Sequence, residues 1–256
     1  MIEALKNGWA HCVCQCGERF VFTNPIHEGE LFAEAMRRNA EIAICKKCKK
    51  IKQDAEEALR KSAAERKAQE LRESAEERCR TAGFRFAELN EPPVRTTATW
   101  LWANRGGHIL LAGETGTGKT TSVAVVVKSM LMTGEIKCRY VTRRELTAEY
   151  VKSKTDDADS EEHFWRRIGR LDLLVVDELV GKRGKERMSD TAQELLFELL
   201  DGAYSGHRKT RIWLMGNFYA GAMENMVSDA EPFKRRLREC FECGWATGKA
   251  VENIDF

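Results

Sequence analysis

The sequence has no long apolar run. No segment approaches the roughly 20 apolar residues that a helix needs to cross a bilayer. The first ten residues, MIEALKNGWA, also lack the extended apolar core of a signal peptide. Neither sign of charge dominates, because 42 Lys and Arg face 40 Asp and Glu and leave a net charge of +2. These absences argue against a membrane protein and a generally polybasic protein. They predict a cytoplasmic location and still allow local basic patches.

Three regions of different composition divide the 256 residues. Residues 1–48 hold most of the cysteines. Residues 49–83 carry interleaved charge on good helix formers, with no glycine before Gly83, which predicts a charged helical linker. Residues 84–256 alternate apolar strand-like runs with helical patterns, which predicts an α/β domain with a parallel sheet covered by helices. The length suffices for one such domain and a small module.

Five of the nine cysteines lie close together near the N-terminus, at Cys12, Cys14, Cys16, Cys45 and Cys48. Tight spacing without a secretory signal favours thiolate metal ligands over disulfides. We expect a structural Zn²⁺ site, in which the metal adds folding energy to a segment with little core. The expected ligands are Cys14, Cys16, Cys45 and Cys48, with Cys12 as an alternative to Cys14 and His11 as a weaker candidate. The others, Cys79, Cys138, Cys240 and Cys243, are expected to be free thiols.

The alternating pattern of the third region predicts its elements in order. Strands are expected at 108–113, 137–142, 171–178, 211–217 and 249–256, which makes a five-stranded parallel sheet. Helices are expected at 119–132, 143–153, 189–206 and 231–240, with Ser189 or Asp190 as the N-cap of the third.

The segment GETGTGKT, residues 113–120, matches the phosphate-binding pattern G-x-x-x-x-G-K-[ST] between a strand and a helix. Glycines let backbone N–H groups curl around phosphates, and the helix N-terminus favours their charge. Lys119 would offset the charge of the β- and γ-phosphates, and Thr120 would ligate Mg²⁺. The expected nucleotide-binding residues are Gly113, Glu114, Thr115, Gly116, Thr117, Gly118, Lys119, Thr120 and Thr121.

Polar side chains close the strands that follow. Asp177 and Glu178 end an apolar strand, where the first would hold Mg²⁺ and the second would activate water as general base. Asn217 ends the next strand and could orient that water. Arg235, Arg236 and Arg238 share one short helix, and a neighbouring subunit could receive one of them as a finger on the γ-phosphate. A basic surface helix is the alternative for these arginines.

These motifs resemble the AAA+ ATPases of the DnaC/DnaI helicase-loader group and their IstB-like relatives. The resemblance lies in HILLAGETGTGKTT, LDLLVVDEL, RIWLMGNF, FKRRLREC and VENIDF. It implies a P-loop core without a C-terminal helical lid, and it makes Arg236 the first candidate for the finger, with Arg235 second. The stretch MGNFYAG departs from the Thr/Ser-Asn that the group more often shows.

The resemblance implies a protein that binds ATP, self-associates, binds single-stranded DNA and delivers a hexameric replicative helicase. It also implies that residues 1–48 form the module that docks on the helicase. Two basic segments at strand ends could track a phosphate backbone. Their cations are Arg143, Arg144, Lys152, Lys154, Lys182, Arg183, Lys185 and Arg187. Two alternatives stay open: an IstB-like transposition ATPase acting on double-stranded DNA, and an adaptor that binds ATP as a switch.

Overall fold

The computed structural model describes residues 2–4, 9–13, 16–23, 46–134, 136–155, 160–180, 187–207, 209–217 and 226–254. The chain divides into two compact units, residues 1–69 and residues 70–256. None of the helices in these described ranges combines the length and the apolar character that a membrane span requires.

The first unit contains a small antiparallel sheet that the sequence did not lead us to expect. Its strands are β1 (Ile2–Ala4), β2 (Trp9–Val13) and β3 (Arg19–Thr23), in the order β1-β2-β3. Cys14 and Cys45 lie outside the described residues. Within the described part of the chain, no three side chains of the metal-binding types gather. The zinc site therefore stays a prediction.

The long helix α2 (Lys46–Thr81) begins three residues before the predicted linker and ends just before Gly83. Gly83 adopts φ +89°, and the N–H of Phe84 donates to the carbonyl of Cys79 at 3.0 Å, which closes the helix end. The boundary between the two units falls inside this helix. Ala75 and Cys79 are buried in the second unit, so the last turns of α2 are part of its core and not a solvated tether.

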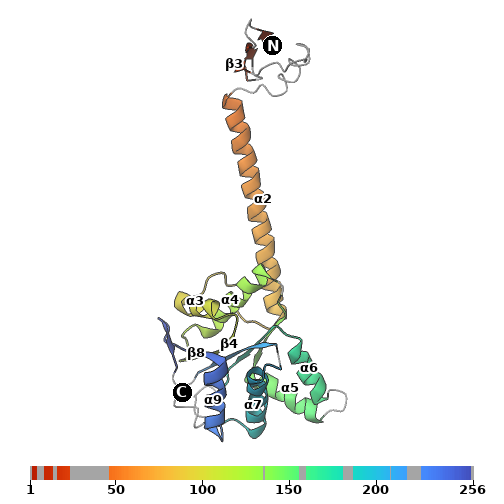
Figure 1. The fold of residues 1–256 in the computed structure, drawn as a ribbon, viewed down its shortest axis with the longest axis vertical. Helices are drawn as coiled ribbons and strands as arrows, with labels where there is room; N and C mark the ends of the chain where they lie inside the picture. The colour runs from red at the N-terminus through yellow and green to blue at the C-terminus, as the bar shows by residue number, and fades with distance from the viewer. Residues whose placement is uncertain are drawn as a thin grey trace. The chain divides into compact units, whose positions relative to one another are not determined.

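The second unit is built on a six-stranded sheet with the order β5-β6-β7-β4-β8-β9 (Figure 1). The strands are β4 (His108–Gly113), β5 (Cys138–Thr142), β6 (Leu173–Asp177), β7 (Arg211–Gly216), β8 (Phe241–Ala246) and β9 (Val251–Asn253). The first five run parallel and β9 runs antiparallel to β8. This is an α/β core with a mostly parallel sheet, as the sequence predicts.

The identity of the fifth parallel strand corrects our expectation. The fifth parallel strand is β8, which pairs with β4 on the side away from β7. The predicted strand at 249–256 supplies only the short antiparallel β9. Glu242 and Gly244 interrupt the apolar pattern of β8, and this hid the strand. Pairing with the buried β4, from His108 opposite Phe241 to Gly113 opposite Ala246, holds it in place.

Helices cover both faces of the sheet and create two apolar cores (Figure 1). The end of α2, α3 (Arg95–Ala103) and α4 (Lys119–Thr133) cover one face. The other face is covered by α5 (Arg143–Thr155), α6 (Glu161–Gly169), α7 (Asp190–Tyr204) and α9 (Ala230–Cys240). Because side chains alternate along each strand, neighbours such as Ile109 and Leu110 enter opposite cores.

Five of these helices were expected, with α2 as the predicted linker, and α3 and α6 were not. Ser189 is the N-cap of α7, where its hydroxyl accepts from the N–H of Ala192 at 3.3 Å. The four expected thiols are free, and burial raises the pKa of Cys79 to about 12 and that of Cys138 to about 11. Such thiols stay protonated and pack as small apolar groups.

Candidate nucleotide-binding site

The phosphate loop connects buried β4 to α4, as the sequence predicts. Gly113 adopts φ +147°, and a Cβ at this position would lie 2.4 Å from the carbonyl oxygen of Ala246. Only glycine therefore lets the chain turn out of β4 while β8 lies alongside. Helix α4 begins directly after Gly118, which adopts φ +78°. The first N–H groups of a helix have no partner within the helix, and here they lie at the end of the loop, where they can bind phosphate.

The Lys119 side chain is 6% exposed and folds over the loop. Its ammonium donates to the carbonyls of Gly113 at 2.8 Å and Glu114 at 2.7 Å, and to the hydroxyl of Thr117 at 3.2 Å. Burial lowers the pKa of Lys119 to about 8, and the Asp177 carboxylate opposes part of that shift. A buried ammonium held only by neutral oxygens is well placed to bind a polyanion, whose charge would stabilise the protonated form.

Thr120 and Asp177 provide two hard oxygen ligands at the mouth of the loop. The Thr120 hydroxyl donates to Oδ2 of Asp177 at 2.9 Å, which joins the first turn of α4 to the end of β6. Hydroxyl and carboxylate oxygens suit Mg²⁺, which also takes oxygens from bound phosphates. The residues therefore fit the metal expected with ATP, and Mg²⁺ would neutralise phosphate charge there.

Glu178 follows Asp177 in an uncommon backbone conformation, with φ +54°. Its N–H donates to Oδ1 of Asp177 at 2.7 Å, and its own side chain is exposed. Non-glycine residues in the left-handed region cost about 1–3 kcal/mol and gather at functional sites. Here the conformation turns the chain at the strand end and leaves Glu178 lining the same cavity as Thr120 and Asp177, the two candidate Mg²⁺ ligands.

A cavity of about 390 Å³ joins most of the predicted groups, although Gly113, Glu114 and Thr117 are not among the residues that line it. It is lined by Phe86, Pro93, Thr115, Gly116, Gly118, Lys119, Thr120, Thr121, Asp177, Glu178 and Asn217. Asn217 was expected beside the acidic pair, and it does reach the same cavity. Phe86 and Pro93 were not predicted. They add an apolar wall next to the phosphate loop, which suits a nucleobase.

Tyr140 is a site residue that sequence reasoning missed. It lies in β5, two residues before Thr142, which pairs with Asp177 in the parallel register. Its hydroxyl donates to Oδ2 of Asp177 at 2.6 Å. Burial and the neighbouring Asp177 charge raise the pKa of Tyr140 well above its usual range, so the phenol stays a donor. Asp177 is thus fixed by Thr120, Tyr140 and the Glu178 N–H.

Replacing Tyr140 by phenylalanine should weaken Mg²⁺-dependent ATP binding. Partners that orient a ligating carboxylate typically contribute a factor of about 10–100 in metal affinity, and we expect the lower end because two donors remain. Titrating a fluorescent ATP analogue at several Mg²⁺ concentrations measures this, with binding in EDTA expected to change less than about twofold. Tyr150→Phe is the matched control, because Tyr150 is also buried and donates to Glu161. Equal Mg²⁺ dependence in the two variants would contradict a positioning role.

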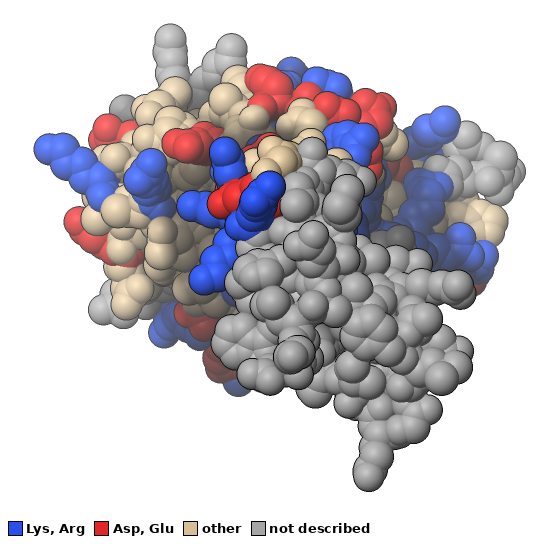
Figure 2. Space-filling view, turned by 90° about the horizontal axis from the view of Figure 1, so that it is seen from above, with Lys and Arg blue, Asp and Glu red and all other residues tan. Residues whose placement is uncertain are grey.

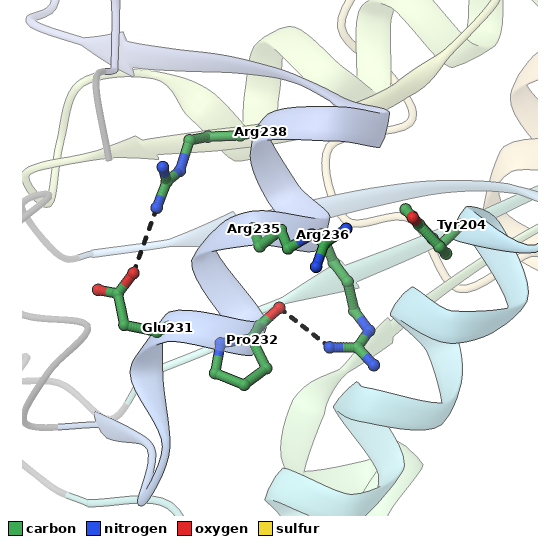
Figure 3. Close-up of a pocket in the computed structure, with 6 residues that line it drawn as sticks. All are labelled: Tyr204, Glu231, Pro232, Arg235, Arg236 and Arg238. Carbon is green, nitrogen blue, oxygen red and sulfur yellow. Dashed lines mark hydrogen bonds and ion pairs between the residues drawn. The ribbon is translucent and has the colours of Figure 1, made fainter.

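The three arginines of α9 lie around a second pocket of about 470 Å³, together with Tyr204, Glu231 and Pro232 (Figure 3). Arg236 points back toward α7, where it pairs with Asp201, donates to the Pro232 carbonyl at 3.0 Å and lies over the Phe197 ring. The Arg235 side chain is 69% exposed; it pairs with Glu239, one turn along α9, and also interacts with Tyr204 of α7. Arg235 is therefore the more accessible of the two finger candidates.

The cations proposed to contact DNA have different surroundings. Arg144 and Lys152 are exposed on α5. Lys154 pairs with Glu194 of α7 at 2.5 Å, and Arg187 donates to Ser228 at 2.6 Å. Lys182, Arg183 and Lys185 lie outside the described residues. Where described residues are visible in Figure 2, basic and acidic side chains intermingle.

Together, the phosphate loop, the pair of oxygen ligands and the strand-loop-helix context define an ATP-binding protein of the P-loop class. The sequence profile of the family described as IstB-like ATP binding protein matches residues 34–230, and the chain belongs to that family. The residues expected to bind the nucleotide, Gly113 to Thr121, lie inside the matched range.

Two curated relatives are similar in sequence to only part of this chain. The chromosomal replication initiator protein DnaA of Corynebacterium aurimucosum is 28% identical over 102 residues, which is 40% of this chain and 18% of the relative. The DnaA of Corynebacterium jeikeium is 24% identical over 148 residues, or 57% of this chain and 23% of the relative. The chain thus matches about a fifth of the length of these proteins.

One solved structure similar to this chain is a crystal structure of the DnaC helicase loader. It shares 18% identity at a TM-score of 0.46, and the match covers 59% of this chain and 86% of that chain. A likeness at this level says nothing about substrate or partner.

Proposed function

We propose that this chain is an ATP-hydrolysing helicase loader of the DnaC/DnaI kind. The observation that carries the proposal is the convergence of Thr120, Asp177 and Glu178 on one cavity with the phosphate loop. An acid that reaches the rim directly after the metal ligand supports water activation and hydrolysis. ATP binding would bring subunits together, so that an arginine of α9 completes the site of its neighbour.

The partner side of the proposal rests on the sequence resemblance to the loader group and on the DNA-replication relatives. Single-stranded DNA would lie along exposed cations such as Arg144 and Lys152. Residues 1–48 would dock on a hexameric replicative helicase. A Zn²⁺ held by Cys14, Cys16, Cys45 and Cys48 would stabilise this module, with no part in the ATP chemistry.

The test is a pull-down of the replicative helicase from the same source by the full chain, with and without ATP. We expect capture, loss of capture when residues 1–45 are removed ahead of α2, and a change in the captured amount for Lys119→Ala. A chain that captures no helicase in any state, but forms ATP-dependent filaments on duplex DNA, would support the second candidate. That candidate is an IstB-like transposition ATPase, which the family match favours.

The zinc proposal makes a separate prediction. Purified full chain should contain about one Zn²⁺ per molecule by elemental analysis, as expected for a four-thiolate site. Cys16→Ser should lower the content, whereas Cys240→Ser should not, because Cys240 lies in the ATPase unit. Full zinc occupancy in Cys16→Ser would remove that residue from the ligand set.

A further inference from the structure

The start of α2 carries an unusual concentration of positive charge. Five of its first eight residues are lysines, and none of the eight is acidic. We call these five the lysine cluster: Lys46, Lys47, Lys49, Lys50 and Lys52. The next stretch of the same helix, residues 54–69, has four acidic and four basic residues and is balanced. The charge of the cluster is therefore local to one end of the helix.

All five lysines are exposed, and none has a carboxylate within ion-pair distance in the described part of the chain. Asp54 and Glu56 follow Lys50 and Lys52 by four residues, yet they form no pair with them. Helix stability does not explain the cluster, because cations in a first turn oppose the helix dipole and α2 has no acid there. Among the residues that the structure describes, no acid offsets this charge, and the lysines face solvent.

We infer that the lysine cluster is a contact surface for the phosphate backbone of a nucleic acid. Lys46, Lys49 and Lys50 share one face of the helix at spacings of three and four residues, and Lys47 and Lys52 flank that face. Lysine acts as a flexible point charge, which suits contact with phosphates without reading of sequence. The proposal rests on the proposed function only in that both involve nucleic acid.

Two other kinds of partner fit less well. A membrane-surface helix needs an apolar face opposite its basic one, and Ile51 is the only large apolar side chain here, at 58% exposed. Protein interfaces are depleted of lysine and rely on buried aromatic, Met and Arg anchors, which the cluster lacks. A phosphate backbone requires neither feature.

The experiment measures binding of the full chain to labelled 30-nucleotide single strands and 30-base-pair duplexes by fluorescence anisotropy between 50 and 300 mM salt. The test variant replaces Lys46, Lys47, Lys49 and Lys50 by glutamine, which keeps helix propensity. The control variant replaces Arg60, Lys61, Arg66 and Lys67 by glutamine. These four are exposed on the same helix but lie in its balanced part.

We expect the test variant to bind at least about tenfold more weakly at 100 mM salt, with the slope of log K against log salt reduced by up to about 3 for single strands. The control variant should change less than about twofold, because its charges are offset by nearby acids. Comparing single strand with duplex identifies the form that the cluster prefers. Circular dichroism confirms that both variants keep the helix.

Equal losses in the two variants, or no loss in the test variant, would overturn the inference. So would a test variant that binds nucleic acid normally but loses an acidic protein partner. The measurements are repeated in a Lys119→Ala background. The lysine cluster lies in residues 1–69, outside the unit that holds the phosphate loop, so its contribution to nucleic-acid binding should not need ATP. Failure of the proposed function looks different: the cluster then binds DNA, while ATP has no effect and no helicase is captured.

Discussion

Replacing Glu178 by glutamine is expected to lower the rate of ATP hydrolysis by a factor of about 10²–10⁴, which is the usual contribution of a general base. The amide keeps the size of the side chain but cannot accept a proton from water. ATP affinity should stay within about threefold, because Lys119, Thr120 and Asp177 are unchanged. Loss of a group that acts only in the chemical step lowers the rate without weakening the binding of ATP. Steady-state hydrolysis and equilibrium binding of a fluorescent ATP analogue give the two numbers.

The matched control is Glu252→Gln, since Glu252 is an exposed glutamate on β9, outside the cavity. It should hydrolyse ATP at the wild-type rate. If Glu178→Gln also hydrolysed at that rate, Glu178 would not be the base. A wild-type chain that binds ATP but hydrolyses none of it would favour the adaptor that uses ATP as a switch.

The backbone at Glu178 gives a reason to expect a large effect. Its φ of +54° is uncommon for a side chain of this kind, and two hydrogen bonds hold the turn. The Glu178 N–H donates to Asp177 at 2.7 Å, and the N–H of Leu179 donates to the Met215 carbonyl of β7 at 2.9 Å. The fold thus fixes the direction in which this carboxylate leaves the strand end, as a preorganised base requires.

Local motifs explain why much of this site could be read from the sequence. The phosphate loop is one continuous segment, and Asp177, Glu178 and Asn217 follow apolar strands whose carboxyl ends meet at one edge of a parallel sheet. The alternation of strands and helices predicts that the strands run parallel, and this was enough to predict that these residues meet in one cavity.

Features that depend on packing between distant segments could not be predicted. Tyr140 was placed in a strand correctly, but its bond to Asp177 depends on the pairing of β5 with β6. Strand β8 is interrupted by polar residues and glycine, and only its pairing with β4 makes it a strand. Phe86 reaches the cavity from the loop after α2, in a left-handed conformation with φ +63°. Nothing in the neighbouring sequence predicts this conformation for a phenylalanine.

The second large effect concerns the arginines of α9. We expect Arg235→Ala to lower ATP hydrolysis by about 10³-fold or more, which is the contribution of an arginine finger. The prediction follows from accessibility, because the Arg235 side chain is 69% exposed and its ion pair with Glu239 lies along its own helix. An exposed ion pair along one helix contributes little to stability, so a neighbouring triphosphate could readily draw the guanidinium away.

Arg236→Ala should act mainly on stability. Arg236 is 26% exposed and is held by Asp201, the Pro232 carbonyl and the Phe197 ring, all within its own chain. Loss of these contacts should lower the free energy of unfolding by about 1–3 kcal/mol, visible as a lower melting temperature. The opposite pattern, with a stable but inactive Arg236→Ala and an active Arg235→Ala, would return the finger to Arg236, the choice made from the sequence resemblance.

A mixing experiment separates a finger that acts on a neighbour from an arginine needed within its own subunit. Arg235→Ala keeps an intact phosphate loop, whereas Lys119→Ala keeps its arginines but loses the ammonium that lies over the loop. If Arg235 acts across the interface, mixing the two inactive chains should restore part of the hydrolysis, because one supplies the ATP site and the other the arginine. No recovery at any ratio, in chains shown to co-assemble, would mean that Arg235 serves its own subunit. Recovery would also show that the ATP site is completed only when two copies meet, which is the behaviour that a loader assembled by ATP requires.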